Sequence, residues 1–223
     1  YAEDPSARLV RAALDILGVA ESDTEYVAFL TQDAMPTGPF WLYDLVTSLE
    51  AYPDAAGAFG RHLAWPDASP FVKWTIDRHF ERCAEAPLFL SRETDPDRYR
   101  KRSGWWRFVR FYSDNNSCLR RSVWQQYPLP EVAYGEDQAW ASTIIEAGFG
   151  KVYAPSATVF HSHDYDEEQT RQRAFTEARF FLEHFDHAVV EPERAREEIE
   201  QRNNRDAVLA AEWGLDAEML RTQ

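Results

Sequence analysis

The sequence is poor in cysteine: Cys83 and Cys118 are the two cysteines of a 223-residue chain. A scaffold held together by many disulfide bonds is therefore excluded. Two thiols in a chain of this size favour free, buried side chains in a reducing compartment. We expect no disulfide bond and a cytoplasmic location.

Positive charge is also scarce, because 24 Lys and Arg stand against 38 Asp and Glu and leave a net charge of −14. Such an acidic surface repels phosphate, so no nucleic-acid partner is expected and broad binding to anionic membranes is disfavoured. No apolar run comes near the roughly 18 residues that a membrane span needs. No basic and then apolar signal segment opens the chain either. These absences indicate a soluble protein.

Hydrophobic residues make up 44% of the sequence, which is enough to build a core. Helical spacing of apolar residues predicts a helix over Pro5–Leu17 that stops at Gly18. The short apolar run Tyr26–Leu30 is typical of a strand buried on both faces. A helix over Phe40–Ala51 and a strand over Ala56–Leu63 follow, and this alternation indicates an α/β fold.

The rest of the chain extends this pattern. Residues Ser91–Ser103 are dense in charge and predict an irregular, mobile loop. The other predicted elements are helices over Phe71–Cys83, Gly135–Ala147, Gln169–Phe185 and Pro192–Trp213, and strands over Phe108–Tyr112, Val152–Ala154 and Thr158–Phe160.

Three polar clusters follow predicted strands or begin a helix, where open α/β sheets bind their ligands. Asp33 follows a buried strand and could hold a divalent cation, or could serve as a turn or cap residue. His161 and His163 lie two apart on an extended segment and should point to opposite faces, so at most one should ligate the same metal. Glu136 and Asp137 could supply a general base or could complement the dipole of a helix.

The order of these clusters carries a family resemblance. The strings are Thr-Gln-Asp-Ala, Asp-Asn-Asn-Ser-Cys-Leu-Arg-Arg-Ser-Val-Trp, Tyr-Gly-Glu-Asp-Gln-Ala-Trp and Val-Phe-His-Ser-His-Asp-Tyr, in this sequence. The set resembles inverting family 2 glycosyltransferases of the GT-A fold, most closely the bacterial rhamnosyltransferase-like branch that builds surface polysaccharide. It covers about Tyr26–Tyr165 and implies a Rossmann-related mixed sheet flanked by helices.

The resemblance implies a metal site for Mg²⁺ or Mn²⁺. Asp33 matches the last acid of the family's Asp-x-Asp motif, and Thr31 stands where the first acid would be, with Gln32 between them. His161 matches the late metal histidine and is preferred over His163 as the second ligand.

The resemblance also implies the catalytic residues. Asp137 matches the base that takes the proton of the acceptor hydroxyl, and Glu136 is its neighbour. Asn116, Ser117 and Arg120 match the segment that lines the acceptor and diphosphate side.

The implied function is metal-dependent, inverting transfer of a hexose, such as rhamnose or another deoxyhexose. The donor would be a nucleotide sugar, and the acceptor a glycan or lipid-linked glycan at the inner face of the plasma membrane, with peripheral membrane association. The family's nucleotide-binding start is absent, so residues 1–165 are expected to form a partial GT-A-like domain and residues 166–223 a C-terminal helical extension. Two alternatives stay open: a degenerate GT-A module that binds glycan or acts as a scaffold, and a metal-dependent hydrolase that uses Asp33 and His161.

Overall fold

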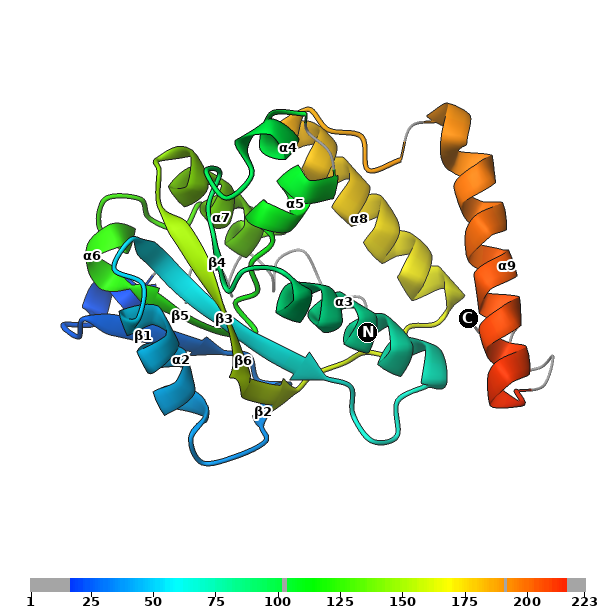
Figure 1. The fold of residues 1–223 in the computed structure, drawn as a ribbon, viewed down its shortest axis with the longest axis horizontal. Coiled ribbons are helices and arrows are strands. Elements are labelled where there is room, and N and C mark those ends of the chain that lie inside the picture. The colour runs from blue at the N-terminus through cyan, green and yellow to red at the C-terminus, as the bar shows by residue number, and fades with distance from the viewer. Residues whose placement is uncertain (1–16, 102–103, 191, 216–223) are drawn as a thin grey trace. The chain divides into compact units, whose positions relative to one another are not determined.

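A computed structural model describes residues 17–101, 104–190 and 192–215 of the protein (Figure 1). The described chain divides into two compact units, one ending at His163 and the other beginning at Asp164. The sequence predicts that a glycosyltransferase domain ends at residue 165 and a helical extension begins at residue 166. That assignment of functions to the two parts stays a prediction.

The first unit is an α/β structure built on a mixed sheet. Within the described residues the strand order is β1 (Tyr26–Leu30), β5 (Asn116–Arg120), β3 (Ala55–Leu63), β6 (Gly150–Phe160) and β2 (Met35–Pro36), and β4 (Phe89–Leu90) also pairs with β6. Strands β3 and β6 are parallel, whereas β5 is antiparallel to both β1 and β3. The carboxyl ends of β1, β3 and β6 therefore meet at one edge of the sheet, together with the amino end of β5.

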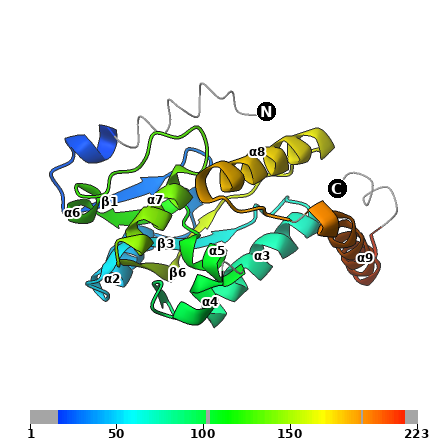
Figure 2. The ribbon, with the colours of Figure 1, turned by 90° about the horizontal axis from the view of Figure 1, so that it is seen from above.

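Helix α2 (Trp41–Glu50) packs on one face of this sheet (Figures 1 and 2). Its Leu45 and Leu49 are fully buried and form an apolar core with strand residues such as Ala58 and Cys118. The helix agrees with the prediction for Phe40–Ala51 to within one residue at each end.

Helix α3 (Pro70–Glu85) packs on the opposite face. It begins after Ser69, whose side chain accepts a hydrogen bond from a first-turn N–H, as expected of an N-cap. Its Phe80 ring lies 6.0 Å from that of Tyr153 in β6, and Tyr153 lies 5.4 Å from Phe59 in β3. This second core is largely aromatic, which explains part of the high content of Phe, Tyr and Trp.

The charged segment expected to be a loop contains helix α4 (Pro96–Arg100), which starts at a Pro behind the capping side chain of Asp95. The loop prediction was wrong here because charge density does not prevent a capped helix from docking through one side chain, in this case the buried Tyr99.

The strand predicted over Phe108–Tyr112 is also wrong. Helix α5 (Gly104–Arg110) occupies most of that range, and its buried Trp106, Val109 and Arg110 recur at helical spacing. The strand instead begins at Asn116, in a polar sequence that shows no apolar alternation.

Strand β6 is one strand where two short ones were predicted. Its pairing with β3 shifts register between Gly60 and Arg61, opposite the segment from Ala154 to Thr158. A bulge of this kind bends the strand without ending it.

Strand β1 is the edge strand of the sheet. It was expected to be buried on both faces, yet Ala28 and Leu30 are exposed and none of its five residues is fully buried. Within the described chain its outer edge pairs with no strand, and this open edge accounts for the exposure.

The second unit contains the two predicted C-terminal helices. Helix α8 (Glu167–Phe185) starts with a capping box between Asp166 and Gln169. A 3₁₀ turn at Pro192–Arg194 leads into α9 (Ala195–Trp213).

Three further expectations concern the chain as a whole. Cys83 and Cys118 are free and buried, as predicted. Among the residues that the structure describes, no helix combines the length and hydropathy needed to cross a bilayer. The helix predicted over Pro5–Leu17 lies outside the described residues except at its last position, and residues 17–21 are helical, past the stop expected at Gly18.

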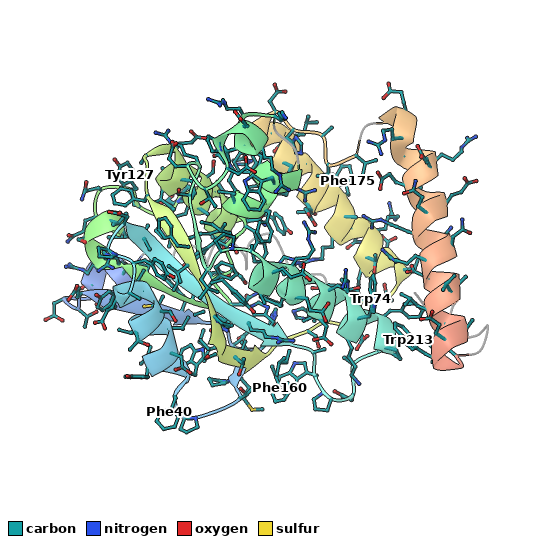
Figure 3. The ribbon with its side chains drawn as sticks, in the orientation of Figure 1. Phe40, Trp74, Tyr127, Phe160, Phe175 and Trp213 are labelled. Atoms are coloured by element: carbon teal, nitrogen blue, oxygen red, sulfur yellow. The ribbon has the colours of Figure 1, made fainter. Side chains whose placement is uncertain are left out.

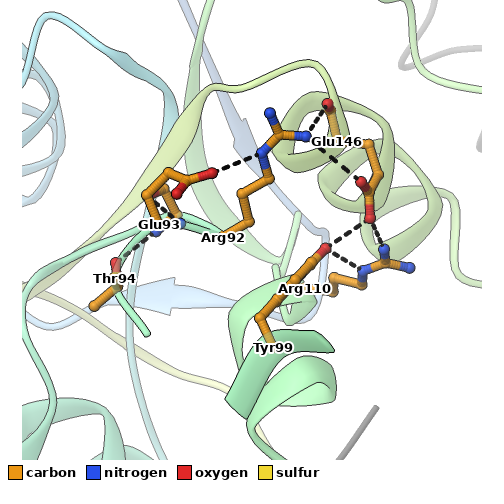
Figure 4. Close-up of polar contacts among 7 residues, drawn as sticks. Arg92, Glu93, Thr94, Tyr99, Arg110 and Glu146 are labelled. Atoms are coloured by element: carbon orange, nitrogen blue, oxygen red, sulfur yellow. Dashed lines mark hydrogen bonds and ion pairs between the residues drawn. The ribbon is translucent and has the colours of Figure 1, made fainter. Parts of the chain in front are cut away.

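A polar network holds α4 and α5 against helix α7 (Glu136–Glu146) (Figure 4). The carboxylate of Glu146 accepts hydrogen bonds from Arg110 and, at 2.8 Å, from the hydroxyl of Tyr99. The Arg110 guanidinium is 3.9 Å from the Trp106 ring centroid, and its side chain is 10% exposed. Loss of its carboxylate partner would leave this buried cation poorly compensated.

We predict that Glu146→Gln lowers the free energy of unfolding by about 1–3 kcal/mol, because it removes the charged acceptor from a buried guanidinium. Urea denaturation of the two proteins measures the difference. Glu81→Gln is the matched control, because Glu81 pairs with Arg78 and both side chains are at least half exposed. The control should change stability by less than about 0.5 kcal/mol, and equal losses in the two variants would contradict a special role for the network.

Candidate active site

Polar side chains gather at the sheet edge where the parallel strands end. Asp33 follows β1, His161 and His163 follow β6, and the turn before β5 brings Asp114 to the same edge. This is the edge at which open α/β sheets bind ligands.

Asp33, His161 and His163 form a cluster suited to a metal ion. Oδ2 of Asp33 lies 3.2 Å from Nε2 of His163 and 3.5 Å from Nε2 of His161. One ligand atom from each residue lies within 4.8 Å of the others. Two ligands held about 2.1 Å from one ion stand roughly 3–4 Å apart, so this spacing fits a shared cation.

The expectation that the two histidines point to opposite faces was wrong. Strand alternation ends with β6 at Phe160, and the chain beyond it follows a different path. The N–H of His161 still bonds to Leu63 O at 2.9 Å, whereas the Ser162 hydroxyl accepts from Trp65 N–H at 3.0 Å. Both imidazoles therefore face Asp33, and their ring centroids are 5.0 Å apart.

Thr31 stands where the family motif has its first acid, and it orients the second acid, Asp33. Its hydroxyl donates to Oδ1 of Asp33 at 2.6 Å, which leaves Oδ2 toward the histidines. Burial raises the pKa of Asp33, but this hydrogen bond and the two imidazoles outweigh it and leave that pKa below its ordinary value. The carboxylate is thus kept ionised, as a metal ligand must be. Gln32, between the two, is exposed.

Glu136 and Asp137 begin α7, as predicted. Gly135 before them has φ of 72°, a left-handed conformation that glycine adopts at little cost. The Asp137 carboxylate accepts from Gln138 N–H at 2.7 Å. Burial, then the negative charges of Asp114 and Glu136, raise the pKa of Asp137 well above its ordinary value. These effects outweigh the helix dipole, which alone would lower that pKa.

Asn116 and Ser117, expected to line the acceptor and diphosphate side, are both fully buried. Asn116 accepts from Trp41 Nε1 at 2.6 Å and donates to Ala157 O at 2.8 Å and Arg61 O at 3.2 Å. The side-chain amide is therefore engaged with the fold, and a role on the acceptor and diphosphate side stays a prediction.

Arg120, expected in the same segment, lies elsewhere in the structure. It lies at the carboxyl end of β5, which is antiparallel, and so occupies the edge opposite the candidate site. Its guanidinium donates to Ala55 O, Leu49 O and the Tyr26 hydroxyl at 3.1–3.3 Å. These bonds join β5 to α2, β3 and β1.

Two residues beside the site were missed from the sequence. Asp114 belongs to the Asp-Asn-Asn-Ser string quoted for the resemblance, yet its approach to Asp137 appears only in the fold. His62 packs with its ring 5.1 Å from that of His161, and burial, followed by neighbouring histidines, lowers its pKa to about 3. His62 is therefore a neutral ring behind the cluster, with no sequence signal beyond its place near the end of β3.

Comparison with known proteins found no family model that matches the chain. It is similar to O-antigen chain rhamnosyltransferase RfbN of Salmonella typhimurium, at 29% identity over 165 residues that cover 71% of this chain and 48% of the relative. It is similar also to O-antigen chain rhamnosyltransferase WbaN of Salmonella anatum, at 31% identity over 155 residues, 69% of this chain and 46% of the relative. The chain spans about half the length of these curated relatives.

We predict that Asn116→Ala lowers the free energy of unfolding by about 2–4 kcal/mol, because it strands an indole N–H and two carbonyls in the core. Denaturant unfolding measures this change. Asn203→Ala on the exposed surface of α9 is the control and should stay within about 0.5 kcal/mol. Unchanged stability in Asn116→Ala, combined with lost ligand binding, would restore the ligand role expected from the sequence.

Proposed function

We propose that the protein is a rhamnosyltransferase-like glycosyltransferase of surface polysaccharide synthesis. It would transfer a sugar such as rhamnose from a nucleotide-sugar donor to a glycan or lipid-linked acceptor. Similarity to two proteins named O-antigen chain rhamnosyltransferase supports the class of enzyme. The observation that carries the proposal is the convergence of a metal-type cluster and a partly buried carboxylate, Asp137, on one sheet edge.

The donor set of Asp33, His161 and His163 fits a divalent cation. A carboxylate with two imidazoles suits Mn²⁺ better than Mg²⁺, which prefers oxygen ligands. Bound there, the cation would neutralise charge on the donor diphosphate, which an acidic protein of net charge −14 would otherwise repel. Three protein ligands leave coordination positions for phosphate oxygens, as a substrate-binding metal requires.

The chain's own residues then have separate tasks. Thr31 orients the Asp33 carboxylate, and Trp65, through Ser162, holds the segment that presents both histidines. Asp137 would accept the proton of the acceptor hydroxyl as the new glycosidic bond forms and the bond to the diphosphate breaks. A base on the acceptor side and a diphosphate on the other side of the sugar would give inversion in one displacement.

The nucleotide of the donor would bind outside this half of the enzyme. The curated relatives are about twice as long as the matched region. A strand as apolar as Tyr26–Leu30 is typical of a sheet interior, so β1 is the place where a sheet of a longer protein would continue. We propose that a nucleotide-binding segment of a GT-A-like fold pairs with this edge.

For the metal site we predict that Mn²⁺ binds weakly alone and more tightly with a nucleoside diphosphate, because phosphate completes the coordination shell. Calorimetric titration of the full-length protein tests this. Asp33→Ala should abolish binding, and His161→Ala and His163→Ala should each weaken it by at least about tenfold.

His184→Ala is the matched control, since His184 is an exposed histidine of α8, and it should bind Mn²⁺ as the wild type does. Binding untouched by Asp33→Ala would contradict the assignment. Normal binding by His163→Ala alone would return the site to the pair of ligands, Asp33 and His161, expected from the sequence.

For the base we predict that Asp137→Asn lowers turnover by about 10²–10⁴ while donor and metal affinities stay within a few-fold, because only the proton acceptor is lost. Turnover of the wild type should rise with pH through a midpoint above the ordinary range of aspartate, since Asp137 is active only when deprotonated and its pKa is raised. Steady-state kinetics with one acceptor measure both effects.

Glu136→Gln is the control, because neighbouring helical residues point about 100° apart and only one can face the acceptor; it should lose less activity. The opposite ranking would exchange the two roles. Full activity of Asp137→Asn would refute the mechanism. Hydrolysis of donor without transfer would identify a metal-dependent hydrolase, and failure to bind any nucleotide sugar would favour the degenerate, glycan-binding or scaffolding module.

A further inference from the structure

Two stacked aromatic rings adjoin the metal-type cluster at the carboxyl ends of the parallel strands. Trp65 follows β3, Phe160 ends β6, and their ring centroids lie 5.5 Å apart with an angle of 19° between the planes. The backbone N–H of Trp65 donates to the Ser162 hydroxyl at 3.0 Å. Phe160 directly precedes His161, and Ser162 lies between His161 and His163. The aromatic pair is therefore tied to the segment that supplies two candidate metal ligands.

A methionine extends this apolar surface to the next strand. Met35 in β2 is the pairing partner of Phe160 in β6, near the end of the sheet where Figure 3 labels Phe160. Residues directly opposite on antiparallel strands carry their side chains on the same face, so Met35 lies beside Phe160. Met35 is 48% exposed, and Trp65 and Phe160 are both partly exposed. Trp65, Phe160 and Met35 thus form an apolar row that reaches the surface.

The row also offers a polar group. Trp65 makes two hydrogen bonds to described residues, and both use its backbone, so its indole N–H donates to none of them. A pyranose ring carries apolar C–H groups on its faces and hydroxyl groups around its rim. An aromatic surface with one N–H donor matches both features, in the way that ligand sites combine apolar walls with a few polar groups.

The position of the row in the sheet favours the acceptor over the donor as its occupant. Strand β1, where the nucleotide-binding segment is proposed to pair, lies at one end of the strand order, and β6 and β2 lie at the other. With the donor diphosphate at the metal-type cluster, the row lies on the side away from the nucleotide. A net charge of −14 disfavours an anionic lipid surface there, whereas an uncharged sugar ring is not repelled.

We propose that Trp65 and Phe160 form an acceptor subsite, on which a sugar ring of the glycan acceptor packs while one of its hydroxyls accepts from the Trp65 indole. This inference rests on the function proposed above, which supplies the glycan acceptor. The contact is made to a part of the acceptor that does not react, so it is equally strong before and during transfer. Its loss therefore raises the KM for the acceptor and leaves kcat and the KM for the donor unchanged.

The test is Trp65→Leu, which keeps the backbone N–H that holds Ser162 but removes the ring and its donor. Saturation-transfer NMR measures binding of methyl glycosides of rhamnose, glucose and galactose to the full-length protein with Mn²⁺ and a nucleoside diphosphate. We expect Trp65→Leu to weaken binding of the glycoside that binds best by about tenfold. Its affinity for Mn²⁺ should stay within about twofold, because the histidine segment keeps its backbone support.

Three further variants sharpen the test. Trp65→Phe keeps a ring and should weaken glycoside binding by only about threefold. Phe160→Leu removes the other ring, should weaken binding at least about threefold, and replaces Trp65→Leu if that variant does not fold. Tyr52→Leu is the matched control, because Tyr52 also stacks on a phenylalanine, Phe89, with centroids 5.5 Å apart, but lies before β3 at the opposite edge of the sheet. It should bind the glycosides as the wild type does.

Unchanged glycoside binding in both Trp65→Leu and Phe160→Leu would overturn the proposal. An equal loss of Mn²⁺ affinity in Trp65→Leu would overturn it too, because Trp65 would then only support the histidines. A wild type that binds none of the glycosides would also overturn it. In that case, binding to vesicles of phosphatidylcholine and phosphatidylglycerol that Trp65→Leu abolishes would assign the row to a lipid surface.

The same variants separate this inference from the proposed function. Weaker glycoside binding in Trp65→Leu, with no sugar transfer by the wild type under any condition, would support the subsite and refute the glycosyltransferase. Transfer by the wild type, with a KM for the acceptor that rises only in the Trp65 and Phe160 variants, would support both. Transfer with an unchanged KM for the acceptor in these variants would overturn the subsite alone.

Discussion

The side-chain amide of Asn116 bonds to two strands and a helix at the point where the pairing of β3 with β6 shifts register. A bulge leaves backbone carbonyls without ladder partners, and buried carbonyls without partners cost free energy. Asn116 donates to two carbonyls at this irregularity, Arg61 O and Ala157 O. Gly60 allows this approach, because a Cβ there would lie 2.3 Å from the Asn116 amide nitrogen. The ends of β3 and β6, and hence His62 and His161, depend on this amide for their positions.

A buried lysine supports the other side of the site. Lys151 is 1% exposed and donates from Nζ to Phe108 O at 3.0 Å and to Phe111 O, near the last turn of α5. Burial lowers its pKa to about 7. The carbonyls at a helix C-terminus favour a cation, so the lysine joins β6 to the chain just before the Ser113–Asn115 turn. The turn is thus held at its entrance by Lys151 and at its exit by Asn116.

Apolar surface next to the site remains exposed. Phe40 is 69% exposed and projects from the loop before α2 (Figure 3), and Met35 in β2 is 48% exposed. Both residues follow Asp33 closely in the sequence. Strand β2 lies at one edge of the sheet, and β1 lies at the other. The chain matches about half of each curated relative. In a protein of that length, further residues could cover Phe40 and Met35.

Local patterns in the sequence determined the α/β class, helices α2, α3, α7, α8 and α9, the strand core of β1 and β3, and the free cysteines. They also singled out Asp33, His161 and Asp137, because carboxylates and imidazoles after strands or at helix starts carry a short-range signal. Only the tertiary structure decided that residues Asn116–Arg120 form strand β5. Asn116 is polar, and it is buried because its neighbours cover it. The tertiary structure likewise decided that His163 joins His161 and that Asn116 and Arg120 bond to neighbouring strands and to α2. The reason is physical: strand ends, bulges and buried polar bonds depend on groups far apart in the sequence, and no local periodicity records those contacts.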